Sequence, residues 1–156
     1  MAGPLSIRPA RPEDQPVLLD IVWQTVMVDP VGNAAVIANP NVVEVPAEHL
    51  TTATACVAER DGAVVGFAIV LPRPDGDAEL DGLFVSPRMQ RGGIGRALMA
   101  AALELAVAQG ARHLHVIANP DAEAFYKAVG FVVTGMTETQ FESVPTMVLP
   151  LAALGR

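Results

Sequence analysis

The segment MQRGGIGRALMA, residues 89–100, combines the residue types that bind phosphate groups. Gly92, Gly93 and Gly95 stand where a helix would begin, although each glycine in a helix interior costs about 1 kcal/mol relative to alanine. Glycines between a strand and a helix let a phosphate approach the backbone closely. The flanking basic residues are Arg88, Arg91 and Arg96. Because the chain has a net charge of −7, this local positive cluster favours an anionic ligand.

Two common phosphate-binding loops do not fit this segment. A P-loop requires GxxxxGK[ST], but Gly95 is followed by Arg96 and Ala97, so both the lysine and the magnesium-binding hydroxyl are missing. The dinucleotide fingerprint GxGxxG fails at Leu98, and the expected acidic ribose ligand is missing from the following HVIANP segment. Nucleotide and dinucleotide binding are therefore disfavoured.

A third ligand class is suggested by Gly82, which lies inside an expected strand just before the turn. A strand glycine often marks a bulge or a close backbone approach. A strand that splays there could hydrogen-bond the amides of a ligand. Coenzyme A joins a pyrophosphate to such a peptide-like arm, so this pattern favours coenzyme A.

The elements that position these residues are predicted from hydrophobic periodicity and turn signals. Pro12, Glu13 and Asp14 open a helix with apolar positions at helical spacing. Asp61-Gly62 predicts a hairpin, and Asn119-Pro120 predicts a capped helix that ends at Gly130. Residues 29–53 are expected to form a long loop or a broken helix. The expected strands are residues 5–9, 54–60, 63–71, 78–85, 113–118, 131–136 and 146–151, and the long helix after the glycine turn runs to Gln109. The pattern predicts one α/β domain over residues 1–156 with a mixed sheet.

Composition excludes several classes of protein. An acidic chain with only 10 lysines and arginines lacks the basic surface that binding to nucleic acid requires. The longest apolar stretch, residues 97–108, is shorter than the roughly 20 residues that span a membrane, and the first residues lack a secretion signal. A lone cysteine excludes an internal disulfide. His113 and His115 suit two positions on one strand face better than metal ligands, since no third ligand is evident nearby. We therefore expect a cytoplasmic protein without a metal.

Several blocks of the chain resemble the GNAT superfamily of acyl-CoA-dependent N-acetyltransferases. The family signature Q/R-x-x-G-x-G/A is matched by QRGGIG, residues 90–95. The preceding AELDGLFVSPRMQ resembles the family's fourth strand and turn, and AFYKAVGF, residues 124–131, resembles its last helix and the strand after it. The opening IRPARPEDQPVLLDIV is similar to the usual family start. The resemblance implies a mixed, mostly antiparallel central sheet of about seven strands, splayed between strands four and five and flanked by helices.

The resemblance also implies how acetyl-CoA is bound. Main-chain groups of Leu83, Phe84 and Val85 would pair with the pantetheine arm, and Asn119 would hydrogen-bond that arm in addition to capping its helix. The pyrophosphate would be held by the signature residues, which are Gln90, Arg91, Gly92, Gly93, Gly95 and Arg96.

Two catalytic roles follow from the same resemblance. Tyr126, the only tyrosine, occupies the position of the general acid that protonates the departing thiolate. A thiol pKa of about 8.5 and a tyrosine pKa of about 10 are close enough for efficient proton transfer. Glu79 occupies a strand position where some family members carry a general base, and Asp81 shares its face. A structural role is an equally good interpretation of Glu79, because other members relay the proton through water.

The acceptor is expected to be a primary amine of a small molecule or peptide. Asp29, Glu44 and Glu48 lie in or beside the segment where the family binds its acceptor, and their charge suits a cationic amine. The resemblance also permits a homodimer. The alternative function is a non-catalytic acyl-CoA-binding sensor or interaction module.

Overall fold

The structure is a computed structural model that describes residues 3–89, 92–140 and 142–152. Its helices are α1 (Gln15–Val26), α2 (Ala34–Ala38), α3 (Ile94–Ala108) and α4 (Glu123–Val129). Its strands are β1 (Leu5–Pro9), β2 (Ala55–Arg60), β3 (Ala63–Pro72), β4 (Ala78–Val85), β5 (His113–Ile117), β6 (Val132–Glu138) and β7 (Ser143–Pro150). Short 3₁₀ turns occur at Pro12–Asp14, Pro40–Val42, Ala47–His49, Pro87–Met89 and Pro120–Ala122.

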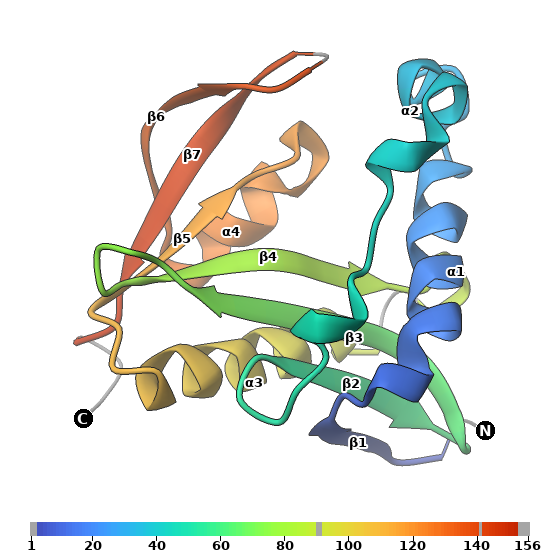
Figure 1. Cartoon of the computed structure of the whole chain (residues 1–156), viewed down its shortest axis with the longest axis horizontal. Helices are drawn as coiled ribbons and strands as arrows, with labels where there is room; N and C mark the ends of the chain where they lie inside the picture. Colours follow the sequence, from blue (N-terminus) through green and yellow to red (C-terminus); the bar gives the residue numbers. More distant parts are fainter. Residues whose placement is uncertain (1–2, 90–91, 141, 153–156) are drawn as a thin grey trace. The chain divides into compact units, whose positions relative to one another are not determined.

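The strands form a seven-stranded sheet in the order β1-β2-β3-β4-β5-β7-β6 (Figure 1). The described ladders are antiparallel except for the β4–β5 ladder, which is parallel. That parallel ladder has three residue pairs, from Ala78↔Leu114 to Leu80↔Val116, and so ends partway along β4. The α/β class and the mixed, mostly antiparallel sheet are therefore confirmed.

The chain divides into two compact units. Unit 1 comprises Met1–Ile69 and Gly82–Ala102, and unit 2 comprises Val70–Asp81 and Leu103–Arg156. The prediction of a single domain over residues 1–156 stays a prediction.

Unit 1 contains the three-stranded antiparallel ladder β1-β2-β3 and the helix α1. Asp61 and Gly62 join β2 to β3 with φ values of 55° and 79°, the positive values that a tight hairpin turn requires. Leu18 and Ile21 of α1 are buried, as the helical spacing of apolar residues predicts. The predicted hairpin and first helix are thus confirmed.

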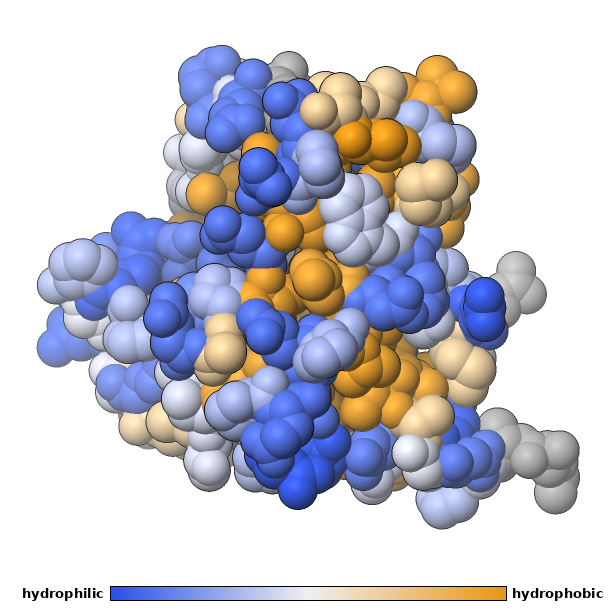
Figure 2. Space-filling model, turned by 45° about the vertical axis from the view of Figure 1, so that its right-hand side comes forward, coloured by the Kyte–Doolittle hydropathy of each residue, from blue (hydrophilic) through white to orange (hydrophobic). Residues whose placement is uncertain are grey.

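Residues 29–53 form a broken helix, as expected from their prolines. Only α2 is α-helical there, and two of the 3₁₀ turns follow it. The end of α1 and this segment expose large apolar side chains: Met27, Val28, Val31, Ile37 and Val42. On the face shown in Figure 2, hydrophobic side chains lie at the surface among hydrophilic ones.

Unit 2 is built on β5, β7 and β6, with α4 between β5 and β6 in the chain (Figure 1). β7 pairs with both neighbours in antiparallel register, and its Met147 and Leu149 are buried. β6 is at the end of the sheet, and its Val132 and Met136 are 57% and 63% exposed.

Candidate active site

Ser86 anchors the start of the glycine turn to the rest of unit 1. The residue is buried, its backbone N–H donates to the Val65 carbonyl at 2.8 Å, and its hydroxyl donates to Gln24 Oε1 at 2.8 Å. These bonds join the end of β4 to β3 and α1. They determine where the chain leaves the sheet and enters the turn at Pro87–Met89.

Gly93 has a backbone conformation that leaves open space beside it. Its φ is +71°, and a Cβ built on it would have no heavy atom of the described residues within 4 Å. Its carbonyl accepts the first hydrogen bond of α3, from the Ala97 N–H at 2.9 Å. Gly92 and Gly93 therefore precede the helix, whereas the sequence analysis places all three glycines where the helix begins. A residue with left-handed φ cannot continue a right-handed helix, so α3 contains Gly95 alone of the three.

The start of α3 provides backbone donors for an anion. The first N–H groups of a helix have no intrahelical acceptor and carry a partial positive charge. In this structure those groups belong to Gly93, Ile94, Gly95 and Arg96. The sequence analysis did not include Ile94 among the phosphate ligands, because its apolar side chain indicates a core position. Its side chain is buried, but its backbone N–H lies in the same first turn of α3. The predicted ligands Gln90 and Arg91 lie outside the described residues.

The end of β4 carries the residues predicted to contact the pantetheine arm. Leu83, Phe84 and Val85 are all half-buried, and the Phe84 ring stacks on Phe67 with a centroid distance of 5.3 Å. A Cβ on Gly82 would lie 3.0 Å from Phe84 Cε2, so this glycine makes room for the ring. The pairing of these backbone groups with a ligand stays a prediction.

Tyr126 is the buried residue of α4. It is 6% exposed, and its ring makes edge-to-face contacts with Phe125 and Phe131 at centroid distances of 5.5 and 5.4 Å. Burial raises the pKa of Tyr126 to about 12, because the charged phenolate is poorly solvated there. The side chain therefore stays protonated over the whole neutral and alkaline range in which most enzymes work.

The helical face of α4 differs from our prediction. The spacing predicts burial of Ala122, Phe125 and Val129 with Tyr126 beside them, but those three are half-buried and Tyr126 is buried. The reason is that Pro120–Ala122 forms a 3₁₀ turn, which has 3.0 residues per turn instead of 3.6. This changes the rotational phase of the residues that follow.

Asn119 caps the 3₁₀ turn, as predicted. Its side-chain oxygen accepts a hydrogen bond from the Asp121 N–H at 3.0 Å, which satisfies one free donor at the start of the turn. Its predicted second contact, with the pantetheine arm, stays a prediction.

Glu79 forms an ion pair in unit 2. Its Oε1 accepts from Arg73 Nη1 at 3.0 Å, and the same guanidinium binds Asp75 at 3.0 Å through Nη2. The hydrogen bond from Arg73 lowers the pKa of Asp75. Glu79 is half-buried, and Oε2 is the oxygen outside the pair. The ion pair adds a structural role to the predicted role as general base.

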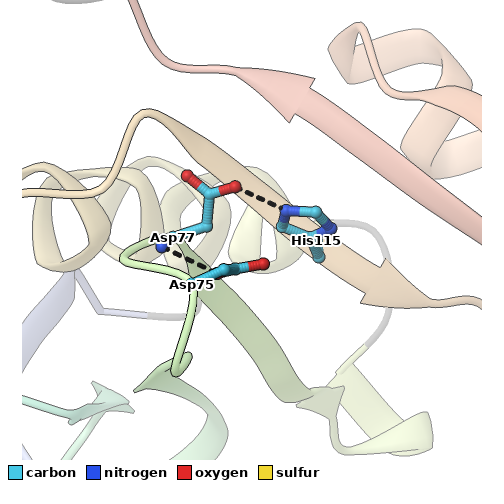
Figure 3. A group of neighbouring side chains, drawn as sticks. All are labelled: Asp75, Asp77 and His115. Atoms are coloured by element: carbon cyan, nitrogen blue, oxygen red, sulfur yellow. Dashed lines mark hydrogen bonds and ion pairs between the residues drawn. The ribbon is translucent and has the colours of Figure 1, made fainter.

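Asp77 lies at the centre of a second polar group in unit 2. Its Oδ2 accepts from His115 Nε2 at 2.9 Å (Figure 3). Its Oδ1 accepts from the His113 backbone N–H at 3.1 Å. These hydrogen bonds, His115 first, lower the pKa of Asp77 to about 2. The two histidines share one strand face, as their spacing predicts. The sequence analysis did not identify Asp77 as a partner of the histidines. The available signal was its position just before β4, which pairs in parallel with the strand β5 that carries them.

Asp75, Asp77 and His115 could also hold a metal ion by spacing alone. Their ligand atoms lie within 4.8 Å of one another (Figure 3). However, Asp77 is already bonded to both histidines and Asp75 to Arg73. The expectation that the protein uses no metal stays a prediction.

The acidic residues near the expected acceptor segment are accessible. Asp29, Glu44 and Glu48 are all exposed, so each can contact a cationic ligand. Within the described part of the chain, no helix is both long and apolar enough to cross a bilayer.

Comparison with known proteins identifies the family. The acetyltransferase (GNAT) family profile matches residues 26–131, which contain the glycine turn, Glu79 and Tyr126. The chain belongs to the GNAT acetyltransferase family, and it is an acyltransferase. Family membership supports the use of acetyl-CoA. No curated protein sequence matches the chain.

Several solved structures share this fold. A GCN5-related N-acetyltransferase from Rhodopseudomonas palustris is 25% identical with a TM-score of 0.73, and the match covers 96% of this chain and 98% of that one. Ard1 from Thermoplasma volcanium is 25% identical with a TM-score of 0.68, covering 94% and 97%. Nourseothricin acetyltransferase is 29% identical with a TM-score of 0.56, covering 62% of this chain and 64% of its own length.

Proposed function

We propose that the protein transfers an acetyl group from acetyl-CoA to a primary amine of a small molecule or peptide. The amine nitrogen attacks the thioester carbonyl directly in a ternary complex, the carbon–sulfur bond breaks, and CoA leaves as a thiolate that takes up a proton. The observation that carries this proposal is the open space beside Gly93 at the start of α3. Backbone N–H groups face such a position in phosphate sites at helix N-termini.

Acetyl-CoA would be bound mainly by main-chain groups. The open side of Gly93 admits the pyrophosphate to the helix N-terminus, where the partial positive charge favours an anion. Leu83, Phe84 and Val85 would pair with the pantetheine arm, assisted by Asn119. The proposed pyrophosphate ligands are Gln90, Arg91, Gly92, Gly93, Ile94, Gly95 and Arg96.

Tyr126 is the proposed general acid. A tyrosine with a pKa of about 12 is fully protonated at neutral pH, so its proton is available when the thiolate forms. An ordinary thiol has a pKa of about 8.5, so the pKa of the donor Tyr126 is well above the pKa of the CoA thiol that accepts the proton. Apolar surroundings raise the pKa of a thiol as they raise that of a phenol, and this narrows the gap.

Glu79 is the proposed general base. An alkylammonium with a pKa of about 10.4 must lose a proton before its nitrogen can attack. Oε2 of Glu79 is available for that proton, since Arg73 binds Oε1. His115 is the register partner of Glu79 on β5, so the two residues lie side by side on neighbouring strands.

Binding and turnover measurements test this proposal. Calorimetry should show micromolar affinity for CoA and acetyl-CoA and much weaker binding of ATP and NAD. A screen of primary amines that follows release of free thiol should then identify an acceptor. Binding without turnover for any amine would favour the alternative, a non-catalytic acyl-CoA-binding module. Failure to bind CoA would contradict both functions.

We also propose that residues 1–156 form one catalytic domain, that it works in the cytoplasm, and that it assembles as a homodimer. The chain has a single cysteine, Cys56, and so contains no internal disulfide, which suits a reducing compartment. Light scattering of the purified protein tests the assembly state.

A further inference from the structure

Arg60 places a guanidinium against the glycine turn. It is the last residue of β2 and belongs to unit 1 together with Gly92. A Cβ built on Gly92 would lie 2.8 Å from Arg60 Nη1 and 3.7 Å from both Cζ and Nη2. The planar end of the arginine therefore lies against the backbone of Gly92, where a side chain at position 92 would displace it.

The guanidinium of Arg60 has no protein partner among the described residues. Its Nε is buried and makes no hydrogen bond, and Arg60 takes part in none of the ion pairs found there. By contrast, Arg8 binds Asp14 and Glu59, and Arg73 binds Asp75 and Glu79. The chain has 17 acidic residues, yet none of the described ones pairs with Arg60.

A buried guanidinium donor without an acceptor is unfavourable. It becomes favourable when a phosphate accepts its planar, paired N–H groups. The N-terminal turn of α3 offers further donors to the same phosphate, because it starts just after Gly92 and Gly93. The side chain and the backbone would then bind a single anion together.

We propose that Arg60 is a phosphate-binding residue for acetyl-CoA and that Gly92 is glycine because the guanidinium occupies the place of a side chain. This inference rests on the proposed function. The phosphate can be the diphosphate or the 3′-phosphate of CoA, and the experiment below distinguishes them.

The test is the affinity of the purified protein for CoA, measured by calorimetry. Arg60→Gln should weaken CoA binding about 10- to 100-fold, the range for loss of charge-assisted hydrogen bonds. Arg60→Lys should restore only part of the affinity, because an ammonium lacks the paired donors. Arg112→Gln is the charge-matched control: it removes the same charge from an arginine that is exposed, and it should change affinity by less than about twofold.

A second ligand identifies the phosphate. With 3′-dephospho-CoA, the loss caused by Arg60→Gln should persist if Arg60 binds the diphosphate, and should vanish if it binds the 3′-phosphate. Either result supports the proposal. Unchanged affinity of Arg60→Gln for both ligands, with wild-type protein binding normally, overturns the role of Arg60 alone. Failure of the wild-type protein to bind CoA overturns the proposed function as well.

A double-mutant cycle tests the part played by Gly92. In Gly92→Ala the added methyl group would occupy the position where the end of Arg60 now lies. Gly92→Ala should weaken CoA binding in the wild-type background and much less in the Arg60→Gln background. Equal losses in both backgrounds would overturn the link between the two residues. Thermal unfolding of each variant checks that the fold is retained.

Discussion

At the scale of single residues, the most informative side chain is Tyr126. Its ring lies between Phe125 and Phe131, and burial raises its pKa to about 12. The hydroxyl therefore stays protonated at neutral and moderately alkaline pH. Deprotonation of Tyr126 should not produce an alkaline limb below about pH 11 in the pH profile of kcat.

The role of Tyr126 can be separated from its packing by removing only the hydroxyl. Tyr126→Phe should lower kcat by roughly 10²- to 10⁴-fold, the usual size of a general acid–base contribution. The affinity for acetyl-CoA should change little, because the ring and its two aromatic contacts remain. Steady-state kinetics with an identified amine, together with calorimetry, make the measurement. An unchanged kcat would show that Tyr126 is a packing residue.

At the scale of elements, the junction of β4 and α3 forms the proposed phosphate site. Gly93 has a left-handed φ and open space, and Ser86 holds the start of the turn against β3 and α1. A strand and a turn thus lead to a helix N-terminus that begins directly after a glycine with open space beside it.

Gly93→Ala should weaken CoA binding by 10-fold or more, because its methyl group enters the proposed pyrophosphate position. The variant also carries backbone strain, since alanine at positive φ costs roughly 1 to 2 kcal/mol. Gly110→Ala is the matched control, because Gly110 ends α3 with a φ of +82° and also has no heavy atom within 4 Å of its built Cβ. Both variants should lose similar stability in thermal unfolding, and only Gly93→Ala should lose CoA affinity. Equal CoA affinity in the two variants would contradict the proposed site.

At the scale of the whole molecule, acid stability should depend on Asp77. Its pKa is about 2 in the folded protein and about 3.9 in an unfolded chain. Between these values the unfolded state binds more protons, so the contribution of Asp77 is complete above about pH 4 and is lost as the pH falls to about 2. The difference in unfolding free energy between wild type and Asp77→Asn should therefore narrow over that range. Denaturant unfolding at several pH values measures it, and a constant difference would contradict the prediction.

Metal removal should leave the affinity for acetyl-CoA unchanged. The proposed site binds phosphate through backbone N–H groups and a guanidinium, and it has neither the lysine nor the hydroxyl of a magnesium-dependent P-loop. Calorimetry with and without excess EDTA tests this. A large loss of affinity would contradict the proposal. Recovery of the affinity on adding zinc would indicate a metal site, for which Asp75, Asp77 and His115 are the candidate ligands.

Local signals in the sequence determined most of the elements. Asp61-Gly62 determined a hairpin, Asn119-Pro120 a capped turn, and Gly110 the end of α3, because each signal acts through backbone conformations of adjacent residues. The glycine turn was readable for the same reason, and its role in binding acetyl-CoA stays a prediction. The buried face of α4 could not be predicted in this way, because residue types only weakly indicate that the segment begins with a 3₁₀ turn.

Only the tertiary structure decided which distant side chains meet. The sequence shows Arg60 in a hairpin and Gly92 in a turn, but only the folding of β2 against the start of α3 places the guanidinium against that glycine. The pairing of Asp77 with His115 likewise requires β4 and β5 to lie in parallel register. Such contacts depend on long-range packing and on how charges are satisfied in three dimensions, and neither is a property of neighbouring residues in the chain.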